Sequence, residues 1–286
     1  MSNNRHFMKM LRTKWEEEKF LCVGLDTEFS KIPLSQRVMK DDLYHDVCKT
    51  VISFNTDIIH QTRDLVCAYM INDVFYRTLG KDGFTTLKET INRIHHLASS
   101  IPVLLNICAG DIGHSNRQTI EYVFDKLDAD GITINPYFGQ EALQPFLDLR
   151  EKGVVVLCRT SNYGANEFQD IISQENNVPL YRTVAWQVSE YWNKNRNCAL
   201  LMGLSSHGEI GKLREIVPNI TIFFTGIGPQ SQTGIIEEDN VREIVVNGKN
   251  KEGTGFVICS SRGVIFSPDP HQEALRLHQL IKKYRF

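Results

Sequence analysis

Short apolar runs rich in β-forming residues alternate along this chain with segments of helical period, and this alternation restricts the fold more than any other feature. Strands that alternate with helices favour a parallel sheet, because parallel neighbours need crossover connections. Eight such units predict an α/β fold, a closed (β/α)8 TIM barrel, with an open doubly wound sheet as the alternative. The expected strands are Phe20–Leu25, Leu65–Ile71, Val103–Ile107, Gly131–Ile134, Val154–Leu157, Ala199–Gly203, Thr221–Phe224 and Gly255–Ile258.

Between the expected strands, apolar residues recur every three or four positions, which is the spacing of amphipathic helices. No linker rich in Ser, Gly or Pro interrupts the pattern, so we expect one domain over residues 1–286. Two longer segments, Ser161–Asn177 and Gln230–Asp239, are predicted loops that could cover a site. The helical stripes begin at Val47, Leu87, Ile120, Tyr181, Ile210 and Ala274.

Composition excludes several classes of partner. The 34 acidic and 32 basic residues nearly cancel, and no Lys/Arg run is long enough for a nucleic-acid surface. No stretch approaches the length of a membrane span, and the charged amino terminus is unlike a secretory signal. The seven cysteines are scattered, with no C-x-x-C pair, and neither Cys nor His recurs at zinc spacing. We therefore expect a cytoplasmic protein with reduced thiols, no metal and no cofactor, and no contact with nucleic acid or membrane.

Glycine turns follow the last two expected strands. Thr225–Gln230 reads TGIGPQ, and Cys259–Gly263 reads CSSRG. In barrels of this type, phosphate groups are frequently held after strands seven and eight, where backbone N–H groups can approach the ligand closely. Arg262 adds a planar guanidinium that matches phosphate oxygens. The pattern predicts a site for a phosphorylated small molecule.

Short motifs resemble those of one family over almost the whole length. LCVGLD (Leu21–Asp26), DIGHS (Asp111–Ser115), NPYFG (Asn135–Gly139), VLCRTSN (Val156–Asn162), GIGPQ (Gly226–Gln230) and SRG (Ser261–Gly263) resemble motifs of orotidine 5'-monophosphate decarboxylase, particularly its longer bacterial type. The resemblance implies a homodimer that binds a pyrimidine nucleotide. It also implies the substrate-binding positions: Asp26 on the ribose, Ser161 on the pyrimidine, Gln230 and Arg262 on the 5'-phosphate, with Asn162, Ser115, Gly228 and Gly263 beside them.

The chain departs from the family where the chemistry should occur. The family's third strand reads D-x-K-x-x-D, whose last aspartate reaches across the dimer interface, and here the corresponding residues are Asn106, Cys108 and Asp111. A further family lysine on the second strand aligns with Met70. Residues two apart on a strand face the same side, and Asp111 lies just past the strand end, so three polar side chains are expected to converge at the barrel mouth.

Decarboxylation at C6 of a pyrimidine leaves negative charge on carbon, which a neighbouring ammonium group stabilises. Loss of one preorganised donor typically costs about 2.7–4 kcal/mol, so efficient decarboxylation of orotidylate is not expected. Three hypotheses remain open. The chain is a diverged enzyme that acts on a pyrimidine nucleotide through Cys108 and Asp111, with Asn106 beside them. Alternatively, it is a non-catalytic nucleotide sensor, or it is a weak or disabled decarboxylase, including an engineered one.

Overall fold

Eight parallel strands close into a barrel in the order of the sequence, from β1 to β8, and β8 pairs with β1. The computed structural model describes residues 5–38, 43–174, 177–204, 208–227 and 237–285. The (β/α)8 barrel expected from the alternating pattern is thereby confirmed, and the open sheet is excluded. The strands are β1 (Leu21–Gly24), β2 (Val66–Asn72), β3 (Val103–Ala109), β4 (Gly131–Ile134), β5 (Gly153–Arg159), β6 (Cys198–Gly203), β7 (Thr221–Thr225) and β8 (Phe256–Ser260).

The strand bounds differ from the expected ones by at most two residues. β3, β5 and β8 each run two residues further toward their carboxyl ends than the apolar runs indicated. These extensions carry polar or reactive side chains, Cys108 on β3, Arg159 on β5 and Ser260 on β8. Apolar runs do not reveal strand ends that carry polar side chains. In this fold, the carboxyl ends of the strands are where active sites lie.

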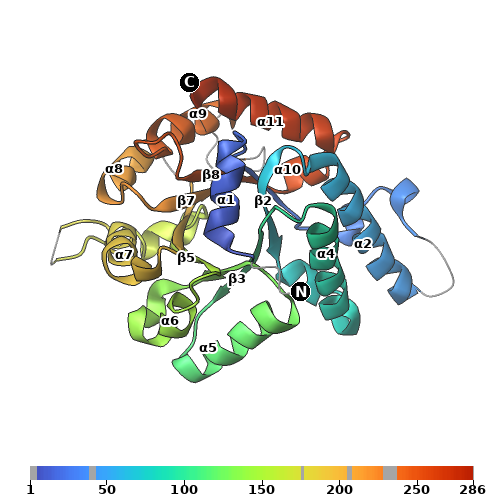
Figure 1. The fold of residues 1–286 in the computed structure, drawn as a ribbon, viewed down its shortest axis with the longest axis horizontal. Helices are drawn as coiled ribbons and strands as arrows, with labels where there is room; N and C mark the ends of the chain where they lie inside the picture. Colours follow the sequence, from blue (N-terminus) through green and yellow to red (C-terminus); the bar gives the residue numbers. More distant parts are fainter. Residues whose placement is uncertain (1–4, 39–42, 175–176, 205–207, 228–236, 286) are drawn as a thin grey trace.

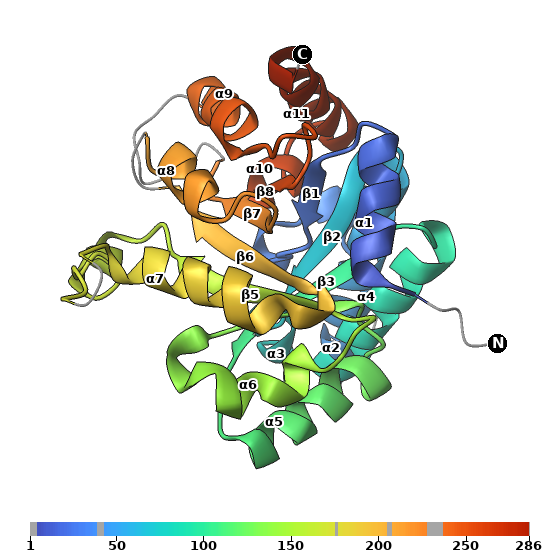
Figure 2. The same cartoon turned by 60° about the vertical axis from the view of Figure 1, so that its left-hand side comes forward.

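Helices surround the barrel in a ring, seen from one end in Figure 1. α5 and α6 pack side by side, and so do α9 and α11, as Figure 2 shows. The predicted loop Gln230–Asp239 is partly wrong, because Glu237–Asp239 form the first turn of α9. Within the described segments, no helix is both long and apolar enough to cross a lipid bilayer. The helices are α1 (Phe7–Glu16), α2 (Leu43–Thr62), α3 (Val74–Arg77), α4 (Gly83–Leu97), α5 (Gly113–Ile120), α6 (Gly139–Leu147), α7 (Leu180–Gln187), α8 (Glu209–Ile216), α9 (Glu237–Gly248), α10 (Arg262–Ile265) and α11 (Pro270–Arg285).

The helix α1, which no apolar stripe listed above predicted, lies across the amino-terminal end of the barrel (Figure 1). Phe7 and Leu11 are fully buried there, and the Phe7 ring stacks on the ring of Phe223 with 6.3 Å between centroids. Because α1 covers this end, we expect a ligand site at the carboxyl ends of the strands.

A buried carboxylate joins the start of the chain to the barrel floor. Asp130, which precedes β4 and is fully buried, accepts hydrogen bonds from Arg5 at 2.7 Å on each of its two oxygens. The Val103 amide donates to the same carboxylate at 2.8 Å. Burial alone would raise the pKa of Asp130, but hydrogen bonds from Arg5, His95 and Val103 hold it below the ordinary value. This pairing fixes the amino terminus to the strands.

Candidate functional site

The end of β3 is bent at Cys108. Cys108 has a φ of +46°, a left-handed conformation that costs a non-glycine residue about 1–2 kcal/mol. The register between β3 and β4 shifts between Leu105 and Ala109, so the strand bulges over these residues. The bulge brings the Cys108 thiol to the surface of the mouth, and the other six cysteines are buried.

Thr133 on β4 holds this bulge in place. Its hydroxyl oxygen accepts the backbone N–H groups of Ile107 at 3.0 Å and Cys108 at 2.9 Å. The same hydroxyl donates to Asn106 Oδ1 at 2.8 Å, and the Cys108 thiol donates to that oxygen at 3.5 Å. The structure therefore brings Asn106 and Cys108 together as expected from their spacing, but through a bulge and through Thr133 rather than along a regular strand.

Asp111 stands apart from this cluster. It is exposed, and its carboxylate accepts the N–H of Ile112 at 2.7 Å. No hydrogen bond joins it to Asn106 or Cys108 among the residues that the structure describes, so the expected convergence of three side chains is seen for two of them. Ser115 lies half-buried on α5, in the turn after Asp111.

Met70 lines the barrel interior beside β1 and β3. Its neighbour Tyr69 bonds through its hydroxyl to Thr62 of α2 at 2.8 Å, so Tyr69 faces the helices. Alternation along β2 then directs Met70 inward, where its side chain is only 6% exposed. An apolar thioether therefore faces the barrel interior at this point of β2.

Asp26 lies just past β1, next to the motif that follows β8. Burial raises the pKa of its carboxyl, although a hydrogen bond from Ser261 and the charge of Arg262 oppose the rise. The approach is close: a Cβ on Gly24 would lie 1.8 Å from the Ser261 hydroxyl, so only glycine fits there. Arg262 is exposed and forms no ion pair within the described part of the chain, which leaves its guanidinium accessible to a ligand.

Ser161 packs where the ends of β5, β6 and β7 meet. A Cβ on Gly203 would lie 2.4 Å from the Ser161 nitrogen, and one on Gly226 would lie 3.3 Å from the Ser161 Cβ. The segment is anchored by Arg159, whose guanidinium binds both oxygens of Asp170 at 2.9 and 2.7 Å. This hydrogen-bonded pairing holds the pKa of the Asp170 carboxyl below its ordinary value. The serine therefore borders the glycine turn after β7.

The remaining predicted residues divide into two groups. Asn162 is exposed and precedes a 3₁₀ turn at Tyr163–Glu167, and Gly263 is half-buried in α10. Gly228 and Gln230, predicted to hold phosphate, lie outside the described residues. Within the described ranges, no group of three or more His, Cys, Asp or Glu side chains is arranged to hold a metal ion.

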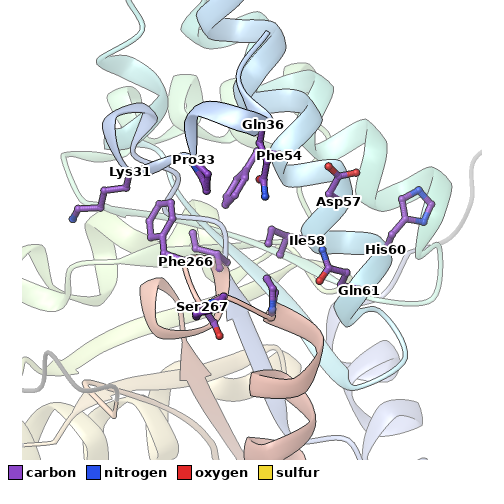
Figure 3. A pocket seen from close by; sticks show the side chains of 13 residues that line it. Lys31, Pro33, Gln36, Phe54, Asp57, Ile58, His60, Gln61, Phe266 and Ser267 are labelled. Carbon is purple, nitrogen blue, oxygen red and sulfur yellow. The ribbon is translucent and has the colours of Figure 1, made fainter.

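A cavity of about 300 Å³ lies away from these residues, on the outside of the barrel. Figure 3 shows Phe54, Asp57 and Gln61 of α2 on one side of it and Phe266 and Ser267 on the other. None of the predicted site residues lines it. The chemistry-bearing side chains instead gather at the carboxyl ends of the strands.

Three residues with a clear place in this arrangement were missed as site residues from the sequence: Thr133, Ser261 and Gly203. Thr133 carries the single hydroxyl in the apolar run of β4, and a lone polar residue in a buried strand could have indicated a role for it. Ser261 was read only as part of the SRG motif, and Gly203 only as the end of a strand.

Fold and site together define a (β/α)8 barrel with a polar mouth, in which Asp26 lies beside Ser261 and Arg262, and Asn106, Cys108 and Thr133 form a second cluster. The model of the family described as "Orotidine 5'-phosphate decarboxylase / HUMPS family" matches residues 19–277. The chain belongs to this family.

Relatives agree with that assignment over most of their length. An orotidine 5'-phosphate decarboxylase of Cellvibrio japonicus is 33% identical over 264 residues, covering 91% of this chain and 90% of the relative. One from Herpetosiphon aurantiacus is 39% identical over 218 residues, covering 76% of each chain. The solved structure of Leishmania donovani OMP decarboxylase, 28% identical, superposes with a TM-score of 0.82 and covers 98% of this chain and 99% of its own.

Proposed function

We propose that this protein binds a pyrimidine nucleoside 5'-monophosphate at the barrel mouth and does not decarboxylate orotidylate efficiently. The observation that carries the proposal is the site's composition: Asp26, Ser161 and Arg262 match the family's contacts to ribose, base and phosphate, whereas Cys108 and Met70 occupy the positions of its lysines. Binding needs the first three residues, and the reaction needs an ammonium group. The nucleotide would be bound with its phosphate at Arg262 and its ring toward Cys108, in the cytoplasm.

The charge pattern supports binding without turnover. The sequence places no Lys or Arg at the carboxyl ends of β2, β3 or β4, over residues 70–74, 106–112 and 134–139. Arg159, at the end of β5, is already paired with Asp170. A carbanion at C6 would therefore have no fixed cation from these strand ends to stabilise it.

Arg262→Gln tests the phosphate contact. We expect the dissociation constant for uridine 5'-monophosphate to rise about tenfold to hundredfold, because a hydrogen bond to a charged group contributes roughly 1.5–3 kcal/mol. Isothermal titration calorimetry measures the change, with Arg93→Gln on the outer helix α4 as the matched control. Equal affinities of the wild type and Arg262→Gln for the nucleotide would show that Arg262 does not bind the phosphate.

A second candidate function, chemistry on the ring, is favoured by one feature: Cys108 is held in a strained conformation at the mouth. As a thiolate it would add to C6, with the C5–C6 electrons moving toward O4 and a proton then delivered to C5. Although the Cys108 side chain is exposed at the mouth, desolvation of its sulfur by the surrounding protein raises the pKa of the thiol. A protonated thiol is a poor nucleophile, so binding is the better-supported function.

Alkylation distinguishes the two candidate functions. We expect iodoacetamide to modify Cys108 before the six buried cysteines, and a saturating pyrimidine nucleotide to slow that reaction. Intact mass spectrometry follows the modification, and Cys108→Ser should abolish its fast phase. With 5-fluoro-UMP we expect no covalent adduct. An adduct on Cys108 would establish the ring chemistry and contradict the purely binding function.

We further propose that two copies of the chain form a homodimer at the mouth. Ile112, Tyr137 and Phe138, next to the carboxyl ends of β3 and β4, are 64%, 88% and 46% exposed. Large apolar side chains gathered at one edge are typical of protein interfaces. We expect light scattering to find a dimer for the wild type and a monomer for Tyr137→Glu. A monomeric wild type at micromolar concentration would contradict this proposal.

A further inference from the structure

We infer that Gln169 is a positioning residue, which fixes the backbone before Ser161 so that this serine is already oriented for a base in the ligand-free protein. The inference rests on the proposed function, since it assumes that Ser161 contacts the base. Gln169 lies beyond the motif Val156–Asn162 that contains the serine, and none of the motifs quoted from the sequence includes it.

The side chain of Gln169 binds Thr160, the residue before Ser161, at two atoms. Its Oε1 accepts the Thr160 N–H at 2.8 Å, and its Nε2 donates to the Thr160 hydroxyl at 2.9 Å. The first of these bonds determines how the amide is oriented, because a backbone N–H needs an acceptor and only Oε1 can accept. Two contacts restrict the backbone at Thr160 more than a single bond would.

Gln169 is itself held by the backbone around it. Its N–H donates to the Ala165 carbonyl at 2.8 Å, and its carbonyl accepts the N–H of Tyr181, in the first turn of α7, at 3.0 Å. The next residue, Asp170, forms the ion pair with Arg159 described above. The segment after β5 is therefore closed at its base by two consecutive pairs and is tied to α7.

The peptide that joins Thr160 to Ser161 also packs on Gly203, the last residue of β6. A Cβ on Gly203 would lie 2.4 Å from the Ser161 nitrogen and 2.7 Å from the Thr160 carbonyl carbon. The peptide is thus held by a hydrogen-bonded side chain and by backbone contact with a neighbouring strand. Ser161 can adjust to a base through its side chain, and little backbone freedom remains to be lost when a ligand binds.

The consequence is specific to the base. Ribose 5-phosphate has no base for Ser161 to contact, so its affinity should not depend on how that serine is held. A pyrimidine nucleotide gains from a fixed serine, because preorganisation lowers the entropy lost on binding. Gln169 should therefore contribute to the affinity for uridine 5'-monophosphate and not to the affinity for ribose 5-phosphate.

The test measures both dissociation constants by isothermal titration calorimetry, with ribose 5-phosphate titrated in competition with the nucleotide. In Gln169→Leu we expect the constant for uridine 5'-monophosphate to rise about threefold to tenfold, the contribution of one hydrogen bond, while that for ribose 5-phosphate stays unchanged. Gln169→Glu keeps an acceptor for the Thr160 N–H and should restore most of the affinity. Asn166→Ala, at an exposed position of the same segment, is the matched control and should bind both ligands like the wild type.

Hydrogen exchange in the ligand-free protein tests the backbone contact separately. We expect the Thr160 amide to exchange at least about tenfold faster in Gln169→Leu than in the wild type, because it has lost its acceptor. Gln169→Ala, which only shortens a half-buried side chain, decides the result if the leucine variant does not fold.

The outcomes separate the inference from the function on which it depends. An unchanged ratio of the two dissociation constants in Gln169→Leu overturns the inference and leaves nucleotide binding intact. An equal loss of affinity for both ligands also overturns it, since that result indicates a general structural role. A wild type that binds neither ligand overturns the proposed function, and the role of Gln169 toward a base falls with it.

Discussion

Orotidylate should lose CO2 on this protein at least about a hundredfold to thousandfold more slowly than on relatives that retain the lysine. That factor corresponds to the roughly 2.7–4 kcal/mol that one preorganised donor contributes to a transition state. In the function proposed above, Cys108 on β3 and Met70 on β2 stand where the relatives carry lysines. Desolvation raises the pKa of the Cys108 thiol, and Met70 is apolar and buried. The decrease in orotidylate absorbance under saturating substrate measures the rate.

Restoring the charged side chains provides the matched control. The triple variant Asn106→Asp, Cys108→Lys and Met70→Lys should raise the rate above that of the wild type by at least about a hundredfold, because it returns ammonium groups to the reacting carbon. Met70→Leu, which keeps that position apolar, should leave the rate unchanged. A wild type already as fast as the lysine-containing relatives would show that another group supplies the charge.

Asp130→Ala should lower the free energy of unfolding by about 3–5 kcal/mol, the usual cost of removing one partner from a buried ion pair. Asp130 is fully buried, and without it the Arg5 guanidinium loses both 2.7 Å contacts and the Val103 N–H loses its acceptor. Urea denaturation followed by circular dichroism measures the loss. Glu89→Ala, which breaks the exposed pair with Arg93 and an exposed 3.5 Å hydrogen bond from Asn92 on α4, should change stability by less than about 1 kcal/mol.

The same carboxylate predicts how stability depends on pH. The folded-state pKa of Asp130 is depressed below the ordinary value of 3.8. Its stabilisation is therefore fully present above that value and is lost as the pH falls through the folded-state pKa. In Asp130→Ala this contribution is absent, so the difference in melting temperature between variant and wild type should shrink below about pH 4. A difference that stayed constant down to pH 2 would contradict the assignment.

The barrel architecture could be predicted from the sequence, because β-rich apolar runs and helical apolar stripes alternate along the whole chain. The bounds of every strand were predicted within two residues, because the centre of each strand is an apolar run that can be recognised in the sequence. The helix α1 was not predicted, because it precedes the first strand and so lies outside the alternation of strands and helices. Its apolar face packs on the amino-terminal end of the barrel. Tertiary burial, with Phe7 stacked on Phe223, decides its place.

The site was predicted less completely, and Cys108 shows why. Spacing correctly indicated that Asn106 and Cys108 would lie together, because residues two apart share a face of a strand. It could not reveal the bulge at β3, which depends on a hydroxyl from the next strand. Thr133 is 25 residues beyond Cys108, and only the register between β3 and β4 brings the two into contact. Local periodicity carries no information about such cross-strand bonds.

Asp111 illustrates a second limit. The resemblance implied that this residue acts across two chains. Among the described residues, its exposed carboxylate accepts a hydrogen bond only from the amide of Ile112. In the proposed homodimer its partners would belong to the other copy, and such a residue would have no local signature in the sequence. The apolar side chains beside it, Ile112 and Tyr137, are the feature that a search for exposed apolar surface would have found.

A crystal structure of the protein with uridine 5'-monophosphate tests the central claim most directly. The account predicts the phosphate against the Arg262 guanidinium, the base beside Ser161, and C5 and C6 of the ring in van der Waals contact with the Cys108 sulfur. A nucleotide bound elsewhere, or a lysine side chain inserted between the ring and Cys108, would contradict it.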